Sequence, residues 1–239
     1  MPSELTKPLT SPVAFPKLRA VAGRIARGTL RLENALFEQR LGISTHGVHN
    51  WTPGDWSQTE HLYYYATSYR RIFRILDSLR LGPSDTFIDL GCGKGRVACC
   101  ASRYPVSQVI GIEDVAELCK LAENNLKLLR GRLAAATIVH GKAEEFEYTS
   151  GTVIYMFHPF GPKTMFAVLS RVERGLRLNP REVRIVYVNP VHEQVLAATE
   201  WLEMYDRWPA QRRLRTEIMH PVSFWRLRDR RSLQKVASR

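Results

Sequence analysis

Long apolar runs and paired cysteines are both missing from this 239-residue chain. No apolar stretch approaches the ~20 residues that a membrane-spanning helix needs, so no transmembrane segment is predicted. The four cysteines, at positions 92, 99, 100 and 119, form no CxxC pair and indicate no disulfide framework. Residues 1–16 lack an apolar core followed by a small-residue cleavage site, which argues against secretion. We therefore expect a reducing, cytoplasmic location.

Acidic side chains are scarce toward both ends of the chain. The whole sequence carries 35 Lys and Arg against 23 Asp and Glu, a net charge of +12. Residues 1–50 hold seven basic and three acidic side chains, and residues 201–239 hold ten and four. The middle is nearly balanced, with 18 and 16. The basic ends predict an anionic partner there, although a solvated surface explains the same surplus equally well.

Residues 1–60 are predicted to form an N-terminal arm and helical extension, and residues 61–239 the main domain. Apolar residues recur with helical spacing among arginines over residues 17–41. Such a helix packs on its own domain or, as the alternative, lies on a membrane surface. Residues 42–60 read as a loop, in which His46 and His49 have no cysteine or carboxylate at zinc-ligand spacing. No metal site is predicted.

Apolar strands and helices alternate through the main domain. Helices are expected at 64–81, 95–104, 114–129 with Asp114 as the N-cap, and from Pro162 onward. The expected strands are Thr86–Leu90, Gln108–Ile112, Thr137–His140, Thr152–Phe157 and Val183–Val188, with extended segments at 200–206 and 216–227 around a basic turn. This pattern predicts an α/β fold: a doubly wound, mostly parallel seven-stranded sheet with helices on both faces. Ligands of such sheets bind at the carboxyl ends of the strands.

A glycine-rich turn follows the first strand, with the sequence Asp89-Leu90-Gly91-Cys92-Gly93-Lys94-Gly95-Arg96. The Gly-Lys-Ser/Thr of a P-loop is absent, and Arg96 replaces the last glycine of a dinucleotide fingerprint. The Asp89 carboxylate at the strand tip repels a pyrophosphate and attracts a sulfonium. A cationic nucleoside fits best, and S-adenosylmethionine is such a ligand.

The segment FIDLGCGKG resembles the first motif of class I S-adenosylmethionine-dependent methyltransferases. The resemblance implies that Asp89, Gly91 and Gly93 hold the methionine portion of this cofactor. Glu113, 24 residues after Asp89 at the tip of the second strand, is placed to accept both ribose hydroxyl protons. Its alternative role is that of a carboxylate in the first turn of a helix. The turn after the third strand implies an adenine contact from the backbone at Lys142 and Ala143.

The fourth strand ends in Phe157-His158-Pro159-Phe160, which resembles the Asn/Asp-Pro-Pro-aromatic motif of methyltransferases that act on nitrogen. We expect Phe157 to contact the cofactor and His158, Pro159 and Phe160 to be the catalytic residues that position the acceptor. His158 stands where the family has Asn or Asp. It either forms a hydrogen bond with the acceptor or takes its proton.

A short segment upstream, Tyr65-Ala66-Thr67, is similar to one in protein-lysine methyltransferases of the seven-strand, histone-modifying type. That similarity implies that Thr67 lies near the methionine end of the cofactor. The expected activity is direct in-line methylation of a nitrogen in a protein side chain or amine. An RNA methyltransferase that uses the basic termini is one alternative. A non-catalytic binding subunit is the other, and the intact Asp89 and Glu113 argue against it.

Overall fold

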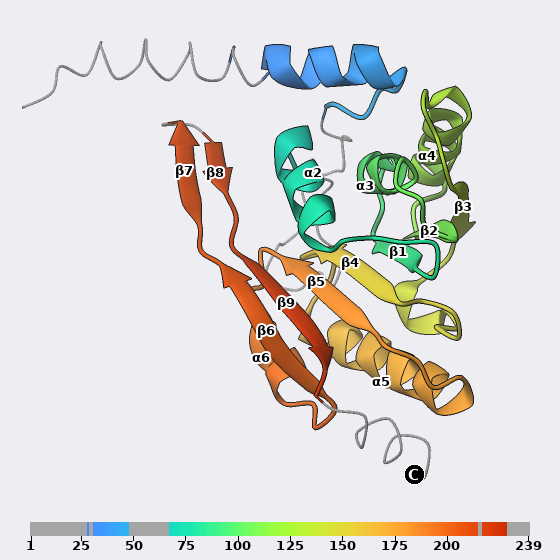
Figure 1. Ribbon diagram of the computed structural model, residues 1–239, viewed down its shortest axis with the longest axis vertical. Helices are drawn as coiled ribbons and strands as arrows, with labels where there is room; N and C mark the ends of the chain where they lie inside the picture. Colours follow the sequence, from blue (N-terminus) through green and yellow to red (C-terminus); the bar gives the residue numbers. More distant parts are fainter. Residues whose placement is uncertain (1–27, 29–30, 48–66, 215–216, 229–239) are drawn as a thin grey trace, which may run out of the picture.

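The computed structural model describes residues 28, 31–47, 67–214 and 217–228, and within them it contains one large sheet (Figure 1). Its seven strands follow the order β3-β2-β1-β4-β5-β9-β6. The predicted doubly wound α/β fold is confirmed. The strands are β1 (Thr86–Leu90), β2 (Gln108–Glu113), β3 (Ala135–His140), β4 (Val153–Phe157), β5 (Arg184–Val188), β6 (Leu202–Trp208) and β9 (Val222–Leu227).

The first five strands run parallel, and β9 runs antiparallel to both of its neighbours, β5 and β6. In the register, Leu90 lies opposite Ile112, and Phe157 lies opposite Val188. The carboxyl ends of these strands therefore meet at one edge, where the loops after β1, β2, β4 and β5 come together. The beginning of β9 reaches the same edge, because Val222 pairs with Val188.

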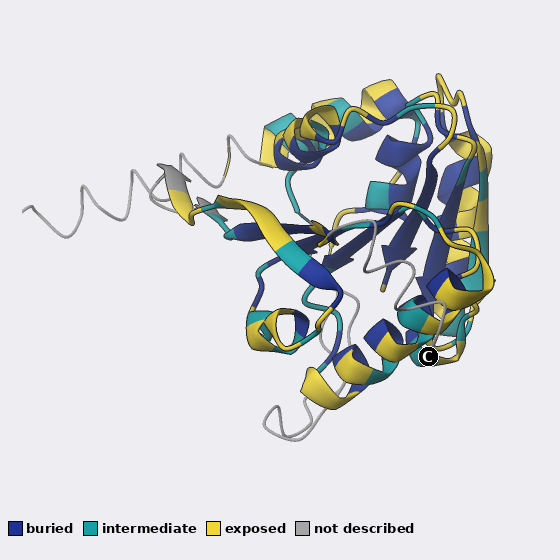
Figure 2. Cartoon of the chain, turned by 60° about the horizontal axis from the view of Figure 1, so that its bottom comes forward, coloured by how far each residue is buried: buried dark blue, intermediate teal, exposed yellow. Residues whose placement is uncertain are grey.

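Helices cover both faces of the sheet (Figure 1). The helices on one face are α2 (Tyr69–Ser78), α3 (Arg96–Ala101) and α4 (Ala116–Leu128); those on the other are α5 (Pro162–Leu178) and α6 (Glu193–Ala197). Side chains alternate along each strand, so Phe87 and Tyr155 pack with the first layer while Ile88 and Ile154 pack with the second. The central strands β1, β2, β4 and β5 are buried on both faces (Figure 2), as expected of a covered parallel sheet.

Two local expectations are wrong. Asp114 does not cap α4, which begins at Ala116 with Val115 as its N-cap; the Asp114 amide donates instead to the Glu113 carboxylate. The basic turn expected after β6 is a two-stranded sheet of β7 (Gln211–Leu214) and β8 (Glu217–Met219). This ribbon prolongs the antiparallel β6–β9 pair beyond the main sheet (Figure 2), and repeated arginines do not indicate such a continuation.

The described part of the N-terminal region packs against the main domain. Residues 31–41 are helical and lie within the predicted helix 17–41; the rest of that range is outside the described residues. Leu41 and Ile43 are buried in the core beneath α2–α4, and Phe37 stacks on Tyr69. The boundary at residue 60 stays a prediction. The loop expected over residues 42–60 is confirmed for residues 42–47, which contain no helix or strand, and the rest of it lies outside the described residues. In the described ranges no helix has the length and apolar character that crossing a membrane requires.

Candidate active site

The glycine loop after β1 lies close to two neighbouring elements. Gly91 and Gly95 have φ angles of 66° and 78°, in the left-handed region that disfavours larger residues. A Cβ atom on Gly91 would lie 2.8 Å from Cβ of Pro159, and one on Gly95 would lie 3.0 Å from Cβ of Ala122. The loop therefore packs directly against the turn after β4 on one side and against α4 on the other.

Glu113, the last residue of β2, binds this loop through its side chain. Its Oε2 accepts a hydrogen bond of 2.8 Å from the Gly93 amide, and its Oε1 accepts from the amides of Asp114 and Val115 at 3.1 Å. The carboxyl group is buried, and that burial raises its pKa even though the Gly93 and Val115 amides oppose the shift. Three of its four lone-pair positions are used, which leaves room for a further donor.

Asp89 lies below the loop and binds the next helix. Its Oδ2 accepts a hydrogen bond of 3.1 Å from the amide of Ala98, in the first turn of α3. Burial raises the pKa of Asp89 to about 7, and the nearby Glu113 charge adds to the shift. Asp89 is only 3% exposed, and its side chain supports the start of α3 behind the loop. Its predicted contact with methionine stays a prediction.

The turn after β3 lies beside Glu113, because the amide of Gly141 donates to the Glu113 carbonyl oxygen at 2.9 Å. Lys142 precedes the short 3-10 helix η1 (Ala143–Glu145), and Tyr148 donates a hydrogen bond of 2.8 Å to the Ala143 carbonyl. The predicted adenine and ribose contacts are thus neighbours at the sheet edge.

The residues predicted for the acceptor follow β4, and the structure separates them. Pro159 touches the glycine loop, whereas Phe160 is 5% exposed and belongs to the core beneath α5. His158 has a φ of 37°, and its Nδ1 lies 3.1 Å from the Tyr187 hydroxyl oxygen. The Phe157 ring packs on His220, which lies just before β9, with ring centroids 5.3 Å apart. Tyr187, within β5, and His220, between β8 and β9, were not predicted from the sequence, because both are distant from His158 along the chain.

Arg96 was also missed, since the sequence marks it only as a residue too large for a glycine position. It is 4% exposed, and its Nη2 lies 3.2 Å from Oε1 of Glu38. Its Nε donates to the Thr45 hydroxyl at 2.7 Å, and its Nη1 donates to the Thr67 carbonyl at 2.9 Å. Burial alone would raise the pKa of Glu38, but hydrogen bonds from Thr45 and His46 and the Arg96 charge lower it. Arg96 therefore joins the described N-terminal residues and Thr67 to the first turn of α3.

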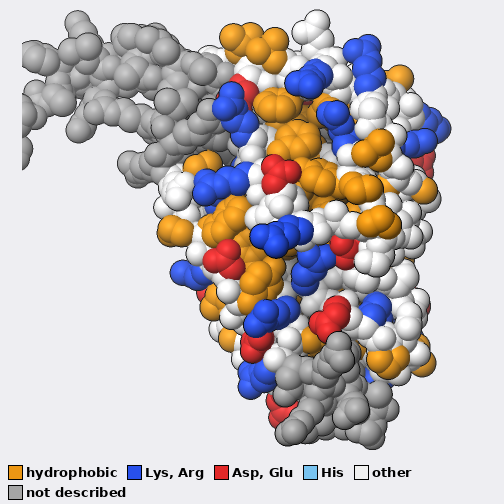
Figure 3. Space-filling model, viewed as in Figure 1, with side chains coloured by type: hydrophobic (Ala, Val, Ile, Leu, Met, Phe, Trp, Pro, Cys, Tyr) orange, Lys and Arg blue, Asp and Glu red, His pale blue; other side chains and the backbone are white. Residues whose placement is uncertain are grey.

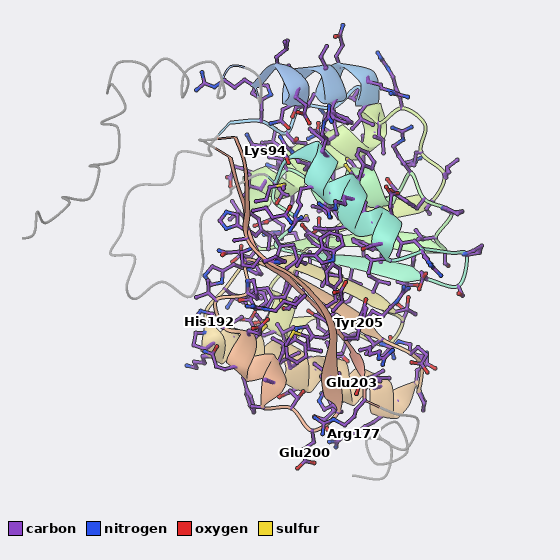
Figure 4. The ribbon with its side chains drawn as sticks, turned by 60° about the vertical axis from the view of Figure 1, so that its left-hand side comes forward. Lys94, Arg177, His192, Glu200, Glu203 and Tyr205 are labelled. Atoms are coloured by element: carbon purple, nitrogen blue, oxygen red, sulfur yellow. The ribbon has the colours of Figure 1, made fainter. Side chains whose placement is uncertain are left out.

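Two more contacts connect the N-terminal segment to the loop. Lys94 Nζ donates to the His46 carbonyl at 2.8 Å, and Asn125 of α4 bonds the backbone of both Ser44 and Lys94. Lys94 and His192, which follow β1 and β5, lie at the same edge of the sheet (Figure 4). The segment 38–46 thus packs on the glycine loop from outside the sheet.

No broad basic strip is visible on the face shown in Figure 3, where Lys and Arg side chains are interspersed with acidic and apolar ones. Within the described ranges, no group of three or more His, Cys, Asp and Glu side chains is placed to hold a metal ion. The four cysteines are buried and free.

Comparison with solved structures supports the fold. An S-adenosylmethionine-dependent O-methyltransferase from Thermotoga maritima aligns with a TM-score of 0.52 and 17% identity, over 70% of this chain and 68% of that one. A precorrin-6y methyltransferase from Geobacter metallireducens aligns with a TM-score of 0.50 and 16% identity, over 74% and 98%. The chain has the Rossmann-like fold of class I methyltransferases, and the resemblance drawn from the glycine loop is confirmed.

Sequence comparison narrows the similarity within that class. Residues 56–152 match the family model described as histone methylation protein DOT1. A protein-lysine N-methyltransferase from Saccharolobus islandicus is 30% identical over 102 residues, which cover 42% of this chain and 63% of that protein. The chain thus spans less than two thirds of the length of this relative. The family-model match, residues 56–152, contains the glycine loop.

Proposed function

We propose that this protein is an S-adenosylmethionine-dependent methyltransferase that methylates an amino nitrogen of a protein side chain. The hydrogen bond from the Gly93 amide to the Glu113 carboxylate carries the proposal. It joins the glycine loop to an acid at the tip of β2, which is the arrangement that a ribose next to a positively charged group requires. Two buried carboxyl groups, Asp89 and Glu113, favour a cation over a phosphate at this edge.

The residues present fit this cofactor. Glu113 has a free lone-pair position for a ribose hydroxyl, and the Gly93 amide that it now binds can be exchanged for a second. Asp89 holds α3 in place behind the loop, and Lys142 and Ala143 offer backbone atoms for the adenine. The bound cofactor supplies an electrophilic methyl group, so the protein needs only to align the acceptor and exclude water. Pro159, in contact with Gly91, brings the turn after β4 against the cofactor loop.

A protein amino group is supported as the acceptor by two findings. The His158-Pro159-Phe160 turn occupies the position of the acceptor motif in nitrogen methyltransferases. The Saccharolobus islandicus relative is named a protein-lysine N-methyltransferase. The four free cysteines support a cytoplasmic location.

RNA is the second candidate acceptor, and the ten basic against four acidic side chains of residues 201–239 favour it. If those charges hold RNA, deletion of residues 229–239 should weaken RNA retention and flatten its salt dependence, while methylation of a small neutral amine is unchanged. Retention without a salt slope in the full chain excludes this use of the basic ends.

Incubation of the full chain with radiolabelled cofactor and fractionated cell extract tests the proposal. Label on protein is the expected outcome, and amino acid analysis should locate it on nitrogen. Label on RNA selects the alternative, and methyl groups on oxygen or carbon exclude the nitrogen acceptor. An absence of transfer together with retained cofactor binding identifies a non-catalytic subunit.

A further inference from the structure

The hydroxyl group of Tyr187 lies buried between two histidines at the edge of the sheet where β4 and β5 end. Tyr187 has 0% exposed surface. Its oxygen lies 3.1 Å from Nδ1 of His158 and 3.3 Å from the backbone nitrogen of His192, the residue before α6. The His158 and His192 rings are 5.1 Å apart, and Figure 4 shows His192 at this edge.

A count of protons fixes the direction of these hydrogen bonds. The backbone N–H of His192 can only donate, so the Tyr187 oxygen accepts from it. The phenol then has one proton to donate from a site closed to water. Among the described residues, Nδ1 of His158 is the acceptor within hydrogen-bond distance. If Nδ1 itself carried a proton, the buried phenol would lack an acceptor. Nδ1 is therefore unprotonated, and the proton of the neutral ring resides on Nε2.

The surroundings of His158 also favour its neutral form. Burial lowers its pKa, and the neighbouring His192 and His220 lower it further. His220 lies next to Arg71, which donates a hydrogen bond to its carbonyl oxygen and whose charge lowers the pKa of His220, while the Glu193 carboxylate acts on Tyr187 from the start of α6. A proton taken up by His158 would be disfavoured both by the two histidines and by the phenol.

We propose that Tyr187 holds His158 as a hydrogen-bond donor, so that Nε2–H binds an oxygen atom of the methyl acceptor instead of taking a proton from its amine. This inference rests on the proposed function and specifies its substrate class: an amine that carries a nearby oxygen acceptor, as a lysine does within a peptide. Tyr187 is a positioning residue, because it acts through His158.

The chemical step remains balanced without a protein base. The acceptor reacts as a neutral amine, whose nitrogen forms a bond to the methyl carbon as the methyl–sulfur bond breaks. The sulfur keeps that electron pair, and water takes the extra proton from the product ammonium. An N–H aimed at the lone pair of the amine would oppose attack, which is why His158 must bind another atom of the acceptor.

Nitrogen NMR of the full chain labelled at its histidines tests the tautomer without any substrate. The signals of His158, identified by their loss in His158→Asn, should show an unprotonated Nδ1 and a protonated Nε2. Tyr187→Phe keeps the buried ring and removes the hydroxyl, so it should produce a mixture of tautomers. Tyr104→Phe, which removes a hydroxyl bonded to Asp77, should leave the His158 signals unchanged. A protonated Nδ1 in the parent, or no response to Tyr187→Phe, overturns the proposal.

A second measurement compares two acceptors, the blocked lysine derivative Nα-acetyl-lysine amide and the oxygen-free butylamine. His158→Ala should lower kcat/KM for the lysine derivative by about tenfold, mainly through KM, as expected for one lost hydrogen bond. The loss for butylamine, which has no oxygen atom to bind, should be clearly smaller, and His158→Asn, which keeps an N–H donor, should restore part of the loss for the lysine derivative. Equal losses for both acceptors overturn the oxygen contact. Failure to methylate any amine counts against the proposed function, while the NMR result decides the tautomer separately.

Discussion

The edge of the sheet that holds the candidate site consists of two parts, which are held together by different kinds of contact. The cofactor half comprises the glycine loop, Asp89 and Glu113, and its contacts are backbone amides that bind carboxylates. The acceptor half comprises the ends of β4 and β5 and the start of β9, and its contacts are between rings: His158, Tyr187, His192 and His220 with Phe157. The halves touch where Gly91 meets Pro159.

Burial shifts the pKa values of the two halves in opposite directions. It raises the pKa of the acids in the cofactor half and lowers the pKa of His158 and His220 in the acceptor half. In both cases the neutral form gains, because desolvation penalises charge of either sign. The comparison shows one principle at work on both sides: burial favours the neutral form of the titratable side chains in each half.

Loss of the Arg96 side chain, which lies on the side of the cofactor half, should have the largest effect. Arg96→Ala leaves the Glu38 carboxylate buried without its cation, and we expect the free energy of unfolding in urea to fall by about 3–5 kcal/mol. Arg103→Ala, at the end of α3 and without an ion pair among the described residues, is the control and should cost far less. Equal losses in the two variants would mean that the Glu38–Arg96 pair has no special weight.

Asp89→Asn tests how the cofactor half makes the stability of the fold depend on pH. Because the pKa of Asp89 is raised from 3.8 to about 7 in the fold, the unfolded chain loses the proton first as the pH rises. The native state therefore loses stability between about pH 4 and pH 7, by at most about 4 kcal/mol at about 1.4 kcal/mol per pKa unit. The Asn variant should lack this decline in urea titrations across that range. Asp206→Asn, at an exposed position in β6, serves as the control; parallel curves for parent and Asp89→Asn would refute the assignment.

Glu113→Ala tests the ligand contact of the cofactor half. Calorimetry should show that S-adenosylmethionine and its demethylated product bind to the parent protein and that NAD and ATP do not. The variant should bind about 1–3 kcal/mol more weakly, since charge-assisted hydrogen bonds to the ribose are lost. Glu117→Ala, exposed on the first turn of α4, should bind like the parent. Unchanged affinity in Glu113→Ala would remove this residue from the ribose site.

His220→Asn should have the smallest effect, and one of opposite sign to that of Asp89. The pKa of His220 is lowered in the fold, so the unfolded chain takes up the proton first as the pH falls below 6.5. The contribution of His220 to stability should fall on acidification, so the free energy of unfolding of the variant relative to the parent should rise between about pH 7 and pH 5. His140→Asn, at an exposed position, is the control. A difference between variant and parent that does not change over this pH range would place His220 outside this effect.

The cofactor half could be predicted from the sequence, and the acceptor half only in part. Asp89, the three glycines and Glu113 stand at fixed distances along two adjacent strands, so local pattern and fold class together locate them. Tyr187 lies inside a uniformly apolar strand, where nothing distinguishes it from a core residue, and only the register of β4 with β5 brings it to His158. Phe160 is the opposite case: its motif predicts a contact with the acceptor, but the fold buries its ring in the core, which the local sequence does not indicate. The buried ion pair of Arg96 could not be predicted either, because its partner Glu38 lies 58 residues earlier and no local pattern connects the two.

The contacts around Arg96 also bear on the order in which the chain can fold during synthesis. Glu38 and Ser44 leave the ribosome first, but Arg96 follows Glu38 by 58 residues and Asn125 follows Ser44 by 81. At roughly 5–20 residues per second, the earlier segment waits on the order of several seconds for its partners. Throughout that interval Leu41 and Ile43 have no core to enter, so the segment next to the glycine loop is synthesised early yet gains its native contacts late.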